Sequence, residues 1–194
     1  MGLVLVTAPA SEPVTLTEAK AHMRIESSFT DEDTLITSLI ARARRHVETL
    51  TERSLLTTTW RLEFTGGGGF DEGGLEPCGG VVILPKPPLI AITTVTYTDA
   101  NGVVQTLSSG DYRADAGVEP GRLWPAYATP WPTCRPGPAA FSITYTAGYA
   151  NAAAVPGPMV QAIHELVAHW HENREGVPPT VGHLLEPWDA IRYQ

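Results

Sequence analysis

The sequence predicts an α+β fold: a small discontinuous helical bundle with three main helices, an inserted antiparallel β domain and a C-terminal docking segment. Apolar residues recur at helical spacing near both ends of the 194-residue chain, whereas the alternation typical of strands is confined to its middle. That middle, residues 58–147, holds 13 of the 18 Gly and 10 of the 17 Pro. We therefore expect a helical core at 1–57 and 148–176, a β-rich insertion at 58–147 and a tail at 177–194.

The first helix is predicted at residues 15–23, where a capping box marks its start. Thr15 and Glu18 stand three residues apart, so each side chain can accept a hydrogen bond from the backbone N–H of the other. The short apolar face consists of Leu16, Ala19 and Met23. This face needs a neighbouring helix to cover it.

The second predicted helix is amphipathic and about twenty residues long. Thr30 is suited to cap it, and the acidic residues at 31–33 lie where the positive end of a helix dipole favours them. The apolar face consists of Leu35, Ile36, Leu39, Ile40, Ala43, Val47 and Leu50. The polar face consists of Thr37, Arg44, Arg45, Glu48 and Glu52.

The third helix is predicted to begin near Pro158, because proline is tolerated at the first helical position, and to continue through Glu172. Its apolar stripe consists of Val160, Ile163, Val167 and Trp170. Gly176 and Pro178 end it. No single helix can bury its own apolar stripe, so we expect the first two to pack against the third.

Two alternating stretches predict the strands at the ends of the insertion. Apolar and polar residues alternate over 60–64 and again over 141–146, as half-buried strands require. Between them, 92–98 and 103–107 form a predicted hairpin, in which Asn101 and Gly102 supply the positive φ angles of a tight turn. Shorter strands are expected at 81–84, 112–115 and 122–124, and a mobile loop at 66–80. The insertion is thus a small antiparallel sheet or barrel.

Three histidines near the end of the third helix invite comparison with helical zinc sites. His164 and His169 are five residues apart, which separates them by about 140° around a helix. His164 and His171 share an azimuth but lie roughly 10 Å apart along the axis, too far for one zinc ion. We therefore predict no metal, no cofactor and no catalytic residue, with a metal-dependent hydrolase resting on these histidines as a minor alternative.

Two other features leave alternatives open. Cys78 and Cys134 fit no metal-ligand spacing and are interpreted as incidental thiols, with a disulfide or a shared metal as the other options. Trp124, Tyr127 and Trp131 lie among prolines, where they either cap the end of a sheet or line a carbohydrate or peptide site. The second option supports an alternative function, a monomeric ligand-binding module that uses the β insertion.

The charge balance limits the partners. The formal net charge is -8, which does not provide the basic surface of a general nucleic-acid binder. No apolar run approaches the roughly 20 residues that span a bilayer, so we expect no membrane partner. The basic cluster on the second helix either forms ion pairs within that helix or faces another subunit. The predicted inter-subunit residues are Arg42, Arg45, Glu48 and Glu52.

Six segments, in order along the chain, carry a family resemblance. They are 13–20 (PVTLTEAK), 54–60 (SLLTTTW), 87–89 (PPL), 111–113 (DYR), 143–149 (ITYTAGY) and 170–175 (WHENRE). Together they resemble the head–tail connector, or head-completion adaptor, proteins of long-tailed phages and of phage-like gene transfer agents. The resemblance covers about 13–176 and leaves the tail largely outside it.

The resemblance implies a structural adaptor without catalysis, assembled as a ring beneath the portal protein of a DNA-filled capsid. Its partners are then the portal, copies of itself in a ring of twelve, and a tail-side neck protein, either a stopper or a tail terminator. DNA passes through the channel without sequence-specific binding, and the ring belongs to the neck of a particle assembled in the host cytoplasm.

The tail is expected to dock on the portal. It keeps more apolar surface than an exposed chain segment normally does, in Leu184, Leu185, Trp188 and Ile191. Pro178, Pro179 and Gly182 separate it from the third helix, so it can order on assembly. The competing possibility is that Trp188 folds back onto its own bundle as ordinary core.

Overall fold

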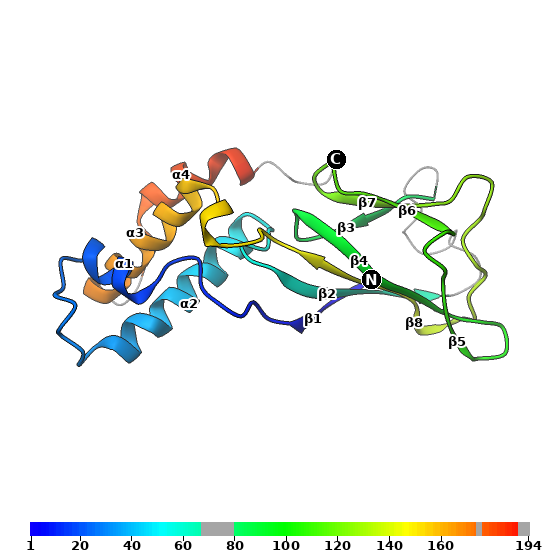
Figure 1. The fold of residues 1–194 in the computed structure, drawn as a ribbon, viewed down its shortest axis with the longest axis horizontal. Coiled ribbons are helices and arrows are strands. Elements are labelled where there is room, and N and C mark those ends of the chain that lie inside the picture. The colour runs from blue at the N-terminus through cyan, green and yellow to red at the C-terminus, as the bar shows by residue number, and fades with distance from the viewer. Residues whose placement is uncertain (67–79, 174–175, 190–194) are drawn as a thin grey trace. The chain divides into compact units, whose positions relative to one another are not determined.

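The computed structural model describes residues 1–66, 80–173 and 176–189 (Figure 1). It confirms an α+β fold and divides into two compact units. The β unit comprises Met1–Ala8 and Thr57–Gly148, and the helical unit comprises Pro9–Leu56 and Tyr149–Gln194. Cys78, Ile191 and most of the predicted mobile loop lie outside the described residues.

The β unit contains a five-stranded antiparallel sheet among its described residues, in the order β1-β2-β8-β4-β5. The strands are β1 (Gly2–Thr7), β2 (Thr58–Gly66), β8 (Gly137–Ala147), β4 (Leu89–Thr98) and β5 (Val104–Thr106). The two alternating stretches of the sequence form β2 and β8, which pair with Leu62 opposite Ile143. Both of these side chains are completely buried, so the predicted apolar face is the core face.

A second antiparallel sheet of the described residues has the order β3-β7-β6. Its strands are β3 (Val82–Leu84), β7 (Gly121–Pro125) and β6 (Tyr112–Asp115), which confirms the three short strands predicted from the sequence. A side chain at Gly121 is excluded, because its Cβ would lie 2.6 Å from the Cβ of Leu89. The described part of the insertion thus contributes to two sheets rather than to the single sheet or barrel that the sequence suggested.

The predicted hairpin is present as β4 and β5, but its turn differs from the one expected. Gly102 has a φ of +83°, whereas Asn101 is not among the residues with positive φ. The Asp99 carboxylate instead organises the loop by accepting hydrogen bonds from the backbone N–H groups of Asn101 and Val103. A hydrogen bond from the Gln105 side chain and these backbone bonds lower the pKa of Asp99.

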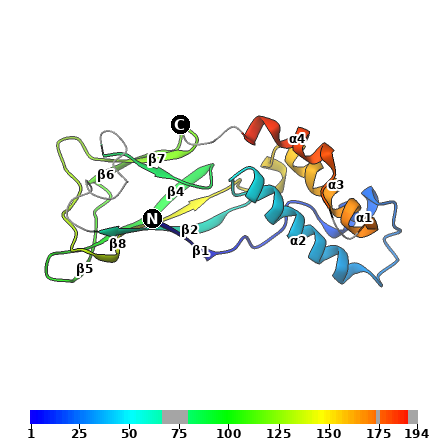
Figure 2. The ribbon, with the colours of Figure 1, turned by 180° about the vertical axis from the view of Figure 1, so that it is seen from behind.

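Strand β1 is the main element that sequence analysis missed. The sequence division kept residues 1–57 in the helical core, but Gly2–Thr7 pairs with β2 and lies at the edge of the larger sheet (Figure 2). Its apolar residues are consecutive rather than alternating, so the pattern carries no period-two signal. Pairing with β2 makes these residues a strand, although the local sequence pattern does not predict one.

The described part of the helical unit has four α-helices, one more than the three predicted as main helices. They are α1 (Leu16–His22), α2 (Asp33–Leu50), α3 (Gly157–Asn173) and α4 (Pro179–Asp189). The capping box of α1 is present, with hydrogen bonds from the Glu18 N–H to Thr15 Oγ1 and from the Thr15 N–H to Glu18 Oε2. Thr30 does not cap α2, because the N-cap residue is Glu32.

The helical core combines both parts of the chain. Its fully buried side chains include Ile36, Ile40 and Val47 from α2 and Ile163 and Leu166 from α3. Two residues assigned to the apolar face of α2 are instead exposed, Leu35 at its first turn and Leu50 at its last.

Helix α4 corrects the picture of a free tail. Val181 and Leu185 lie in the core of the helical unit, with exposed fractions of 0% and 2%. Leu184 and Trp188 are half-buried and pack against the same core. The segment is therefore a part of the bundle, which is the competing possibility that the sequence left open for Trp188.

We predict that Leu185→Ala lowers the free energy of unfolding by about 2–5 kcal/mol, because it leaves a cavity in the core. Leu184→Ala is the matched control and has a smaller effect, since that side chain is only half-buried. Urea denaturation of both variants measures the difference. Equal, small effects would contradict the packing of α4 on the bundle.

Candidate functional site

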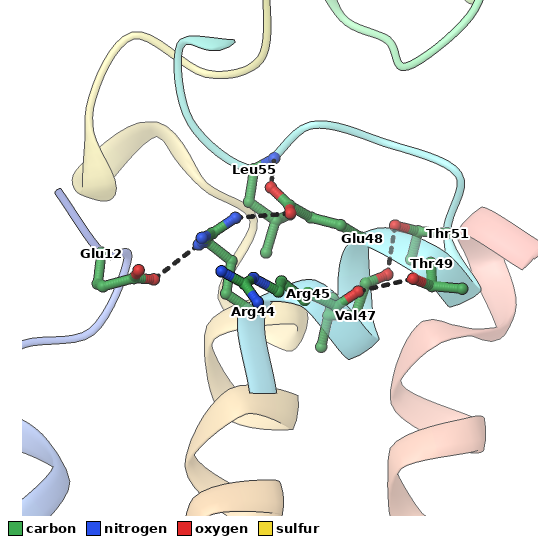
Figure 3. A network of polar contacts seen from close by, with 8 residues as sticks. All are labelled: Glu12, Arg44, Arg45, Val47, Glu48, Thr49, Thr51 and Leu55. Carbon is green, nitrogen blue, oxygen red and sulfur yellow. Dashed lines mark hydrogen bonds and ion pairs between the residues drawn. The ribbon is translucent and has the colours of Figure 1, made fainter. Parts of the chain in front are cut away.

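A buried arginine is the centre of the polar contacts on α2 (Figure 3). Arg44 is 7% exposed, although the sequence placed it on the polar face. Its Nε donates to Glu12 Oε2 at 2.7 Å, and its Nη1 donates to Glu48 Oε2 at 2.7 Å. The helical spacing in the sequence indicates this burial, because Arg44 follows Ile40 by four residues and precedes Val47 by three, which places it on the apolar face.

The Arg44 network reaches two connecting segments of the helical unit. Glu48 Oε1 accepts a hydrogen bond from the Leu55 backbone N–H at 3.1 Å, just before the chain leaves this unit after Leu56. Glu12 lies just after the chain first enters the unit at Pro9. Arg44 therefore holds the first segment directly, and Glu48, its ion-pair partner, holds the second.

The third connecting segment has its own contact. Tyr149 is the residue at which the chain returns to the helical unit, and its hydroxyl oxygen accepts a hydrogen bond from Arg53 Nη1 at 3.4 Å. Arg53 is also buried. All three segments that lead into or out of the helical unit are thus held by side-chain hydrogen bonds that involve Arg44, Glu48 or Arg53.

The electrostatics favour a charged Arg44. Burial opposes the charged form, but the hydrogen bonds and charges of Glu12 and Glu48 outweigh it and raise the pKa of Arg44. Glu48 is consequently committed within its own chain, through contacts with Arg44 and Leu55. The intrahelical ion pair is the first of the two options that the sequence left open for this cluster.

The other predicted inter-subunit residues lie on the surface. The guanidinium carbon of Arg42 lies 4.1 Å from the centre of the Trp170 ring, a cation–π contact that fixes its direction. Arg45 is exposed on α2. Glu52 is also exposed, but it follows the C-cap residue Thr51 and has a φ of +54°, so it lies beyond the helix.

The structure separates the predicted portal-docking residues into two kinds. Leu185 is buried in the core, which removes it from any docking surface as long as α4 stays on the bundle. Leu184 and Trp188 are half-buried and keep part of their apolar surface accessible. Ile191 lies outside the described residues.

The three histidines of α3 do not converge. The rings of His164 and His22 lie 5.0 Å apart, His171 Nε2 is 3.0 Å from Glu32 Oε2, and His169 Nδ1 is 3.3 Å from Asn173 Nδ2. Within the described residues, no three His, Cys, Asp or Glu side chains are grouped as metal ligands. This arrangement of the described histidines therefore does not support the alternative function of a metal-dependent hydrolase.

Burial and the neighbouring His22 lower the pKa of His164, while Glu18 acts in the opposite direction. Because the folded state holds this proton less tightly than the unfolded state, the contribution of His164 to stability is lost as pH falls below its ordinary value of 6.5. The effect is a property of folding and needs no ligand.

The Trp/Tyr cluster is divided between core and surface. Trp131 donates from Nε1 to the Gly80 carbonyl at 2.6 Å and meets the Phe141 ring edge-on, so it is a structural residue. Trp124 and Tyr127 are exposed, by 39% and 94%. They line an open cavity of about 430 Å³ together with Arg113, Ala114, Asp115 and Pro125.

Two further absences apply to the described part of the chain. No helix there has both the length and the apolar character needed to cross a membrane. Cys134 forms no disulfide within those residues, and burial raises the pKa of its thiol. A thiol held in its neutral form is a weak nucleophile.

Comparison with solved structures identifies the class of assembly in which this fold occurs. The chain is similar to a chain of the neck of an empty gene transfer agent particle, computed with C6 symmetry, with 26% identity and a TM-score of 0.81. It is also similar to chains in the virion of a native gene transfer agent particle, at 26% and 0.77, and in a native neck computed with C12 symmetry, at 25% and 0.73. Each match covers 100% of this chain and 98% of the other.

A family model specifies the class further. The model for phage gp6-like head-tail connector proteins matches residues 13–111, and the chain belongs to this family. The matched residues include the capping box of α1, the Arg44–Glu48 pair and the β4–β5 hairpin. A search of curated proteins gave no match.

We predict that the double variant Glu12→Gln with Glu48→Gln lowers the free energy of unfolding by about 3–5 kcal/mol, because it leaves the Arg44 charge buried without a counter-charge. Arg44→Met costs less, since it removes that charge and keeps an apolar side chain. Denaturant unfolding measures both.

The control is Arg61→Gln, which breaks the ion pair between Arg61 and Glu63. Both side chains of that pair are partly exposed, so the change costs at most about 1 kcal/mol. If the double variant were as mild as the control, the Arg44 network would not be a stabilising contact.

Proposed function

We propose that this chain forms a structural adaptor ring in the neck of a phage or phage-like particle, joining the portal of a DNA-filled capsid to the tail. The observation that carries the proposal is the full-length similarity to chains of gene transfer agent necks, together with membership of the connector family. Because the similarity covers both units, it applies to the whole architecture and not to a shared motif.

The ring is proposed to contain twelve copies and to form part of the DNA channel. The C12 symmetry of a neck that contains a similar chain supports this number. A net charge of -8 supports a passive channel, because a polyanion is not retained by a surface that lacks an excess of basic residues. DNA then passes without sequence-specific binding, and the chain needs no cofactor for this role.

Contacts between neighbouring copies are proposed to include the exposed surface of α2. Arg42 and Arg45 are exposed on α2 and Glu52 is exposed just beyond its end, whereas Glu48 is held by Arg44. The cation–π contact with Trp170 orients Arg42 before assembly, which reduces the entropy lost when it meets a partner. Charges at such a surface align neighbouring subunits more than they hold them together.

The portal contact is proposed to use the exposed side of the C-terminal segment. Leu184 and Trp188 are four residues apart on α4 and retain accessible apolar surface, and Ile191 follows them in the sequence. Leu185 serves instead to anchor α4 to the bundle. The tail-side partner is proposed to be a stopper or tail terminator protein, and assembly to take place in the host cytoplasm.

Deletion of the chain from the particle-producing cell is expected to give DNA-filled heads that lack tails and lose their DNA. Supplying the wild-type chain restores complete particles, and electron microscopy with a nuclease-protection assay measures both effects. Supplying the Arg45→Glu variant restores fewer, because it reverses a charge on the proposed subunit interface.

The matched control is Arg113→Glu, which reverses an exposed charge in the β unit. It is expected to restore particles as the wild type does. Tailed, DNA-retaining particles in the absence of the chain would refute the adaptor function.

A further inference from the structure

The larger sheet of the β unit has an unprotected edge at β1. Val4, Leu5 and Val6 are exposed by 37%, 50% and 48%. Strand β1 pairs only with β2 among the described strands, so the backbone groups on its other side are open. Natural sheets usually protect such an edge with charged residues or proline, and β1 contains neither.

The opposite edge of the same sheet is also partly open. Strand β5 pairs with β4 at Thr96–Thr98, and the backbone N–H of Leu107, just after β5, donates to the Val95 carbonyl. Within the described residues, no strand pairs on that side with the part of β4 that precedes Val95. Ala91 and Thr94 are exposed there, and Ile90 is 45% exposed. Like β1, the strand β4 contains no charged residue and no proline.

Two different open edges on one sheet suit a cyclic assembly. In a ring with rotational symmetry, every copy meets one neighbour through one surface and the other neighbour through a different surface. All pairings in the sheet are antiparallel, so β1 and β8 run in one direction and β2 and β4 in the other. Strand β1 of one copy and β4 of a similarly oriented copy are therefore antiparallel.

The register within the sheet indicates which residues face one another. Val4 lies opposite Arg61, Arg61 opposite Thr144, and Thr144 opposite Thr94. When the paired residues are followed across the sheet in the same way, Thr7 lies level with Ala91. A neighbour placed without a shift along the strands would bring Val4 beside the neighbour's Thr94, and Thr7 beside its Ala91.

We propose that strand β1 docks on a second copy of this chain, pairing antiparallel with the open part of β4 in that copy. The proposal rests on the ring of the proposed function. The absence of charge on both strands makes them compatible partners, and burial of Val4, Leu5 and Val6 removes apolar surface from water. Main-chain hydrogen bonds add the alignment that side chains alone do not provide.

Engineered cysteine pairs test this contact in assembled particles. The background carries Cys78→Ser and Cys134→Ser, and the test pairs are Val4→Cys with Thr94→Cys and Thr7→Cys with Ala91→Cys. Within one chain these positions are three strand spacings apart, about 14 Å, which exceeds the reach of a disulfide. Mild oxidation is therefore expected to give a ladder of linked subunits, resolved by non-reducing electrophoresis and removed by a reductant.

The single-cysteine variants are expected to give no species larger than a dimer. Val4→Cys with Val177→Cys is the matched control, because both positions are exposed but belong to different units. Thermal unfolding of each variant, compared with the cysteine-free background, checks that the fold is retained, which is expected since Val4, Thr7, Ala91 and Thr94 are exposed.

The outcomes separate this inference from the proposed function. Particles that hold both test pairs at wild-type occupancy but give no ladder would overturn the β1 contact and leave the adaptor ring standing. The β1 contact would also be overturned if the control pair gave as much linked product as the test pairs. Wild-type particles that contain no ring of this chain would overturn the proposed function itself.

Discussion

The ion-pair network of Arg44 is the constraint that orders the connecting segments of the helical unit, because Arg44 bonds Glu12 directly and reaches Leu55 through Glu48. The bundle core is assembled from Pro9–Leu56 and Tyr149–Gln194, which are separated by the whole excursion through the β strands. Closing such a long loop costs conformational entropy. The burial of apolar side chains of α2 against α3 offsets that cost, and the bonds from Arg44 to Glu12 and Glu48 give the connecting segments one arrangement.

This construction leaves distinct surfaces for assembly. The core uses one face of α2, so Arg42 and Arg45 remain on the surface, while Arg44 is consumed within the chain. In the β unit, β1 has an open outer side among the described strands, and β5 leaves part of β4 open at the opposite edge. A subunit with separate, non-identical surfaces is suited to head-to-tail contacts around an axis, which is the geometry of a closed ring.

Local patterns predicted most of the elements, and contacts between distant residues explain the failures. The Thr15 capping box and the alternation in β2 and β8 depend on neighbouring residues, and the structure confirms them. Strand β1 requires pairing with residues more than fifty positions away, which no local pattern encodes. The burial of Leu185 in its own bundle was not predicted. Apolar residues of a helix form the same sequence pattern whether they face a partner or their own core. The resemblance indicated the connector family, which no single residue of the site indicates.

The central claim is that this chain forms the adaptor ring of a particle neck. A reconstruction of that neck without imposed symmetry, from particles in which the chain is identified by peptide mass spectrometry, tests it most directly. The account predicts twelve copies in one ring between portal and tail, surrounding the DNA channel. One or two copies at the neck, or a location elsewhere in the particle, would contradict it.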